Sequence, residues 1–128
     1  MTRKYLPDKF TAALGGYGGD NYSVRLEGDK LIYKKNYEET VLEPDAEAWK
    51  EFWETLEEIN IWDWETSYKP DTPILDGTSW KVDIKYGEKK VLSSGSNAYP
   101  PSSEERMSDD FKEFCQAVSD LCGGRKFR

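Results

Sequence analysis

Two amphipathic segments with the same spacing of apolar residues constrain the fold of this chain more than any other feature. Each predicts a helix with one apolar stripe, because apolar side chains recur at steps of three and four residues. The first begins after Asp45 and the second after Ser108, both favourable N-cap residues, and Gly123-Gly124 ends the second. The stripes match position by position: Trp49, Phe52, Trp53, Leu56 and Ile59, then Phe111, Phe114, Cys115, Val118 and Leu121.

A predicted hairpin precedes each helix. Residues 22–27 alternate apolar and polar side chains, and a Gly-Asp turn leads into residues 30–34. Residues 80–86 alternate in the same way, and a Gly-Glu turn leads into residues 89–92. One apolar face on each strand is typical of an antiparallel sheet that is covered on one side.

The pattern predicts a single α+β domain over residues 1–128, in which a duplicated strand-strand-helix unit occupies about 17–60 and 76–122. The simplest packing is a four-stranded antiparallel sheet with two helices on one face. Residues 10–14 and 60–64 could each add an edge strand, which would make the sheet five- or six-stranded.

Charge and composition argue against several classes of function. The 128 residues include 25 acidic and 18 basic side chains, for a net charge of −7, so we expect no basic face for nucleic acid. No apolar run approaches the roughly 20 residues of a membrane helix, and the first residues do not resemble a signal peptide, which predicts a cytoplasmic protein without a membrane partner. There is no histidine, so we expect neither a metal nor a cofactor.

Cys115 and Cys122 fall in the second predicted helix. With a rise of about 1.5 Å per residue, their Cα atoms would lie about 10 Å apart, too far for a disulfide. We expect both to be buried, reduced thiols that pack as small apolar residues.

Two features that follow Asp45 favour binding of another protein. Trp62, Trp64 and Tyr68 have a spacing that would align their rings as an aromatic binding surface, although the same rings could close one end of the core. The polar face of the first helix would be an acidic docking patch for a basic partner, although such a run is also typical of a solvated face. The patch comprises Glu47, Glu51, Glu54, Glu57 and Glu58.

Three predicted loops, at residues 15–20, 63–79 and 95–101, offer polar groups to a small ligand or peptide. Their candidate residues, beyond the aromatic group above, are Tyr17, Asp20, Asp76, Asn97 and Tyr99. The loops would converge if the two halves of the sheet pack with twofold pseudosymmetry, and otherwise they are plain connections. An enzyme would need Asp20 or Asp76 in an apolar setting that raises its pKa. Tyr17 or Tyr99 would then be the partner acid.

Three strings in the chain are distinctive: Trp49-x-x-Phe52, Trp62-x-Trp64 and Gly95-Ser96-Asn97-Ala98-Tyr99-Pro100. Over about residues 17–122 they resemble a group of small uncharacterised bacterial proteins, a domain of unknown function. The resemblance implies a bacterial, cytoplasmic protein and no particular mechanism.

These observations favour a non-enzymatic protein-binding or accessory module, of which an immunity-type protein that neutralises a basic partner is one version. A pocket for a small ligand or peptide at the three loops is the alternative. A small carboxylate-dependent enzyme is the weakest of the three hypotheses.

Overall fold

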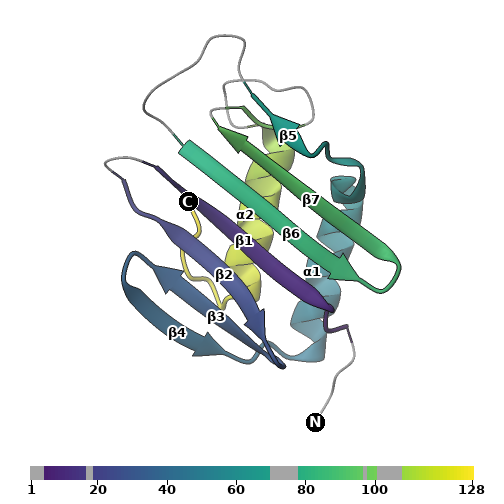
Figure 1. Cartoon of the computed structure of the whole chain (residues 1–128). Coiled ribbons are helices and arrows are strands. Elements are labelled where there is room, and N and C mark those ends of the chain that lie inside the picture. Colours follow the sequence, from purple (N-terminus) through teal and green to yellow (C-terminus); the bar gives the residue numbers. More distant parts are fainter. Residues whose placement is uncertain (1–4, 17–18, 70–77, 97, 101–107) are drawn as a thin grey trace.

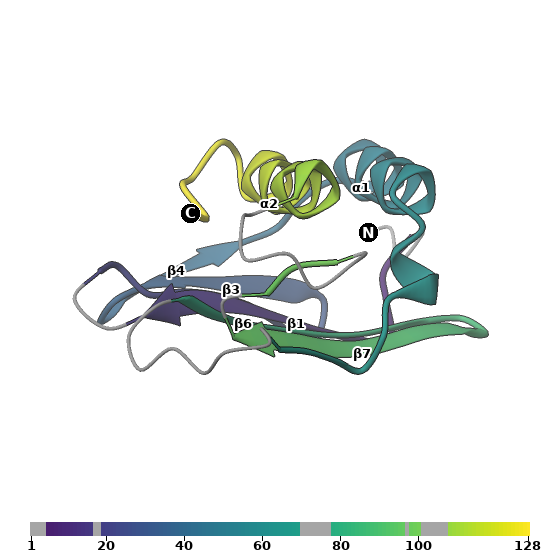
Figure 2. The ribbon, with the colours of Figure 1, turned by 90° about the horizontal axis from the view of Figure 1, so that it is seen from above.

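The protein forms two layers, a sheet and a pair of helices (Figures 1 and 2). The computed structural model describes residues 5–16, 19–69, 78–96, 98–100 and 108–128. Its helices are α1 (Ala46–Glu58), the 3₁₀-helix η1 (Ile61–Asp63) and α2 (Asp109–Leu121). Its strands are β1 (Lys9–Gly16), β2 (Tyr22–Glu27), β3 (Lys30–Lys35), β4 (Glu38–Leu42), β5 (Ser67–Tyr68), β6 (Thr78–Tyr86) and β7 (Lys89–Ser96).

Within the described residues the strands form one seven-stranded sheet in the order β4-β3-β2-β1-β6-β7-β5. All neighbours are antiparallel except β5 and β7. The predicted α+β class, hairpins and two helices on one face are confirmed, but the sheet is larger than predicted. Strands β4 and β5 were not predicted, because β4 has little apolar alternation and β5 has only two residues.

Of the two additional strands that the sequence suggests, one forms, and it does not lie at the edge of the sheet. Residues 10–14 do lie in a strand, β1, but β1 is central because its whole length pairs with β6 on one side while β2 covers the other. Residues 60–64 form no strand. Asn60 adopts a left-handed conformation (φ 54°) and η1 follows, which turns the fully buried Ile61 into the core.

Both helices begin where the sequence predicts, and α2 also ends where predicted. Asp45 caps α1 by accepting a hydrogen bond from the Ala48 amide (2.8 Å), and Ser108 caps α2 by accepting one from the Phe111 amide (3.1 Å). Gly123 and Gly124 follow α2 with positive φ angles. Neither helix in the described part of the chain is long and apolar enough to cross a membrane. That the two halves are copies of one unit stays a prediction.

The core fills the space between the helices and one face of the sheet (Figure 2). On β1, the buried Phe10, Ala12 and Leu14 point toward the helices, and the Phe10 ring packs against Trp49 and Phe52 of α1. Full burial of an apolar side chain of this size contributes about 1.5–3 kcal/mol. This face of the sheet is therefore committed to the core, and only its other face is open.

The C-terminal residues return to the core after α2. Phe127 is only 2% exposed, and its ring lies beside the rings of Tyr22 and Phe114. The Tyr33 hydroxyl donates a hydrogen bond to the Lys126 carbonyl oxygen. The tail thus fastens the end of α2 to strands β2 and β3.

We predict that Phe127→Ala lowers the free energy of unfolding by about 2–4 kcal/mol, because it removes a buried aromatic side chain. Urea unfolding followed by circular dichroism measures this change. Arg128→Ala, at an exposed position beside it, should change stability by less than about 0.5 kcal/mol. Equal losses in the two variants would show that the tail is not docked.

Candidate functional site

Charge is divided between the two layers of the molecule. The exposed sides of α1 and α2 are mainly acidic, with Lys50 and Lys112 as the basic exceptions. We call these surfaces the helical layer; its acidic residues are Glu47, Glu51, Glu54, Glu57, Glu58, Asp109, Asp110, Glu113 and Asp120. The predicted acidic patch on α1 is therefore exposed and is extended by α2.

The opposite surface, which we call the open face, consists of the sheet side chains that point away from the helices. No helix or strand of the described residues covers it (Figure 2). Strand register and the alternation of burial place its basic side chains at Lys9, Arg25, Lys30, Lys34, Lys81, Lys85 and Lys90, and its acidic ones at Glu27, Glu39 and Asp83. Basic groups thus predominate on the open face of an acidic protein.

A groove of about 300 Å³ runs between α1 and α2 in the helical layer. Its apolar lining includes the largely buried side chains of Phe52, Ala117 and Leu121. Glu51 from α1 and Asp120 from α2 contribute carboxylates to the same groove. An apolar groove with two exposed carboxylates beside it is suited to a long basic side chain. The methylene groups of that side chain would pack on the apolar lining, and its charged group would bind the carboxylates.

The predicted aromatic surface is wrong for two of its three members. Trp64 packs in the core against Phe111 and Phe114, and Tyr68 is only 2% exposed. Only Trp62 reaches the surface in part. It stacks on Trp53 (ring centroids 6.2 Å) and donates a hydrogen bond from Nε1 to a Glu57 carboxylate oxygen (3.1 Å).

Glu57 is the one member of the acidic patch that the structure shows in an ion pair, with Lys89. Lys89 also lies over the Trp62 ring, 6.0 Å from its centroid. The hydrogen bond from Lys89, with a further contribution from Trp62, lowers the pKa of Glu57. This end of the patch is already partly neutralised, whereas Glu51 at the groove and the other members of the patch form no ion pair among the described residues.

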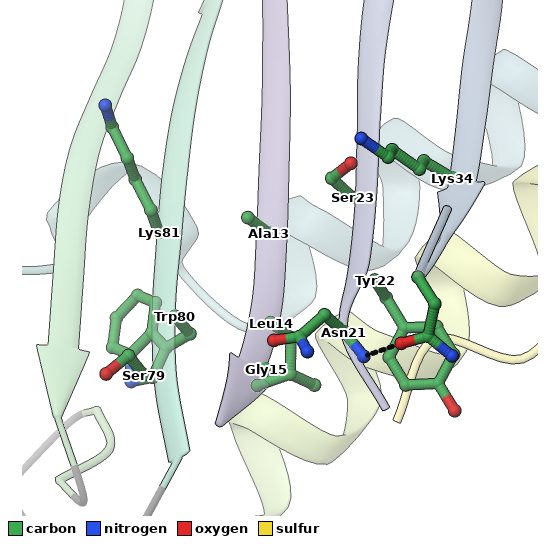
Figure 3. Close-up of a pocket in the computed structure, with 11 residues that line it drawn as sticks. Ala13, Leu14, Gly15, Asn21, Tyr22, Ser23, Lys34, Ser79, Trp80 and Lys81 are labelled. Carbon is green, nitrogen blue, oxygen red and sulfur yellow. Dashed lines mark hydrogen bonds between the residues drawn. The ribbon is translucent and has the colours of Figure 1, made fainter. Parts of the chain in front are cut away.

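A hollow of about 410 Å³ lies where several strand ends meet (Figure 3). Small side chains of Ala13, Ser23 and Ser79 line it, and Lys34 and Lys81 stand on either side. Gly15, Asn21 and Asn36 line the end nearer the loops. The register pairs Gly16 at the end of β1 with Thr78 at the start of β6, and Ser79 of β6 with Ser96 at the end of β7. The strand ends that adjoin the three predicted loops therefore lie side by side.

Of the two candidate catalytic carboxylates, Asp20 and Asp76, the structure describes Asp20, and its setting differs from the enzymatic prediction. It is exposed, and it accepts hydrogen bonds from the side-chain amide of Asn36 (3.0 Å) and the Tyr22 hydroxyl (3.3 Å). The Asn36 hydrogen bond is the main reason that the pKa of Asp20 is lowered, with nearby Lys35 adding to it. An acid catalyst needs a raised pKa, so the predicted apolar setting for Asp20 is wrong.

Tyr99 does not stand at a pocket rim, because its ring is buried against Phe111 (ring centroids 4.9 Å). Burial raises its pKa, and a hydrogen bond with Thr78 works against that rise. A raised pKa also makes the phenol a weaker partner acid. The predicted site residues Tyr17, Asp76 and Asn97 lie outside the described residues.

Both cysteines are free and buried, as the sequence predicts. Burial raises the pKa of each thiol to about 12. A thiol with such a pKa is protonated at neutral pH and is a poor nucleophile or metal ligand. In the part of the chain that the structure describes, no three Cys, Asp or Glu side chains gather in a way that could hold a metal ion.

The chain matches no protein-family model, and a search of the curated proteins finds no match. The resemblance of its distinctive strings to small bacterial proteins therefore stays a prediction. Sequence reasoning did not single out Asp120, Lys34 or Lys81 as site residues. The sequence held no signal for the two lysines, because Ala13 and Ser23 come to lie between them only through the pairing of four strands.

The buried thiols predict a specific pH dependence of stability. Folding raises the pKa of each thiol from about 9 in the unfolded chain to about 12. The contribution of each thiol to stability is therefore fully present below pH 9, and it is lost as the pH rises from 9 toward 12. At pH 10 each thiol should have lost about 1 kcal/mol of its contribution. Urea unfolding at pH 8 and pH 10 should show a smaller pH effect in Cys115→Ala than in the wild type. Identical pH effects would contradict a protonated, buried thiol.

Proposed function

We propose that this protein is a non-enzymatic binding module whose helical layer docks a basic surface of another protein. The groove between α1 and α2 is the observation that carries the proposal. It combines apolar lining, which a partner side chain would fill, with the Glu51 and Asp120 carboxylates, which would receive its charge.

Charge supports the same assignment. Neither Glu51 nor Asp120 forms an ion pair among the described residues. Asp120 accepts a hydrogen bond from the Gln116 side-chain amide (2.9 Å), which orients its carboxylate without neutralising it. The other acids of the helical layer would add a longer-range field that speeds encounter with a basic partner. An accessory or immunity-type role in the bacterial cytoplasm is consistent with such a surface.

A labelled arginine-rich peptide tests the groove directly, and the same peptide with citrulline in place of arginine is its uncharged control. We expect the arginine peptide to bind with an affinity that falls as salt is raised. Glu51→Gln combined with Asp120→Asn should weaken this binding roughly tenfold, as the loss of two exposed charge contacts would. Fluorescence anisotropy measures the affinities.

Glu38→Gln combined with Glu88→Gln is the matched control, because it removes the same charge from exposed positions outside the helical layer. Its affinity should stay within about twofold of the wild type. If this control weakens binding as much as the groove variant, the attraction is a general effect of net charge. If the citrulline peptide binds equally well, charge does not direct the binding.

A further inference from the structure

We infer that the hollow on the open face is a second binding site, for an extended acidic peptide segment. It lies on the opposite side of the sheet from the helical layer, so it does not rest on the function proposed above. The inference starts from the way the strand register arranges the side chains around the hollow.

One row of side chains crosses four strands at the hollow. Lys34 on β3 lies opposite Ser23 on β2, Ser23 lies opposite Ala13 on β1, and Ala13 lies opposite Lys81 on β6. Two lysines thus flank two small side chains (Figure 3). The gap leaves room for the main chain of a ligand between the two ammonium groups.

The charges of the two lysines are not neutralised by an acidic partner within the described residues, so they can bind such a ligand. Among the described residues neither Lys34 nor Lys81 forms an ion pair. Their nearest acidic neighbours on the open face are already engaged, since Glu39 pairs with Arg25 (3.2 Å) and Asp83 with Lys9 (2.7 Å).

A second row strengthens the positive potential. Lys85 lies directly opposite Lys90, with which it shares no acidic partner among the described residues, and opposite Lys9, whose charge is partly balanced by Asp83. Like charges in that arrangement destabilise a sheet. A ligand that carries negative charge would relieve the repulsion, which supports binding on this face.

The distance between the two lysines indicates which class of ligand can contact both of them. The α-carbons of Lys34 and Lys81 are three strand spacings apart, about 14 Å, which is wider than one carboxylate or phosphate. In an extended peptide, side chains at positions i and i+4 lie about 13 Å apart on one face. A segment with acidic residues at that interval therefore reaches both lysines while its centre lies over Ala13 and Ser23.

A nucleic acid fits this face less well than a peptide. The outward positions of the described strands carry no aromatic side chain on which a base could stack. The net charge of −7 also opposes a long polyanion, whereas a short acidic segment needs only the local lysines.

The test uses the full chain and a fluorescein-labelled hexaglutamate peptide at low salt. The wild type should bind it, and Lys34→Gln combined with Lys81→Gln should weaken binding roughly tenfold. Lys50→Gln combined with Lys112→Gln removes the same charge from the helical layer and should leave the affinity within about twofold. Lys34→Arg combined with Lys81→Arg should retain binding, because it keeps both charges.

Amide chemical shifts locate the site independently. On titration with hexaglutamate, the largest changes should fall at Ala13, Ser23 and Lys81. The inference is overturned if hexaglutamine binds equally well, if the changes centre on the helices, or if Lys34→Gln with Lys81→Gln binds like the wild type. Tighter binding of a ten-nucleotide oligothymidine at the same residues would overturn the choice of a peptide.

Discussion

The rest of the structure depends on the long antiparallel pairing of β1 with β6. This pairing joins every residue of Lys9–Gly16 to a residue of β6, far away in the sequence, and so unites the two hairpins in one sheet. It places α1 and α2 on the same face, where their facing surfaces leave the groove at Phe52 and Leu121. It also places Ala13 beside Lys81, which creates one side of the hollow. Both candidate sites are consequences of one strand pairing.

The sheet separates two surfaces of opposite charge. On its helical side the apolar residues of the central strands pack against the apolar stripes of α1 and α2, so the acids of the two helices face solvent or a partner. On its open side lysines are spread over strands whose other outward positions are mostly small or polar, with Ile32, Val41 and Leu92 as the large apolar exceptions. The net charge of −7 does not reveal this division, because a sum over all residues says nothing of where the charges lie. A protein of this design can contact a basic surface and an acidic segment at once without competition between them.

Local signals in the sequence predicted local structure well. The caps at Asp45 and Ser108 and the alternation in both hairpins depend on neighbouring residues, and the structure confirms them. Position within the sheet was harder to predict, because the central place of β1 follows from pairing with distant residues. Trp64 illustrates the same limit: its spacing suited a surface, but the 3₁₀ turn at Ile61 directs it into the core. The groove and the hollow arise from packing between separate elements, so neither had a sequence signal of its own.

The central claim is that the helical layer binds a basic partner. Zero-length carbodiimide cross-linking in a lysate of the source organism tests it most directly. The reagent joins a carboxylate only to an amine in direct contact with it, and mass spectrometry identifies both residues. Cross-links from Glu51 or Asp120 to lysines of one partner protein, absent with Glu51→Gln and Asp120→Asn, are the predicted result. Cross-links that join a partner only to carboxylates outside α1 and α2, such as Glu38 or Glu88, would contradict it.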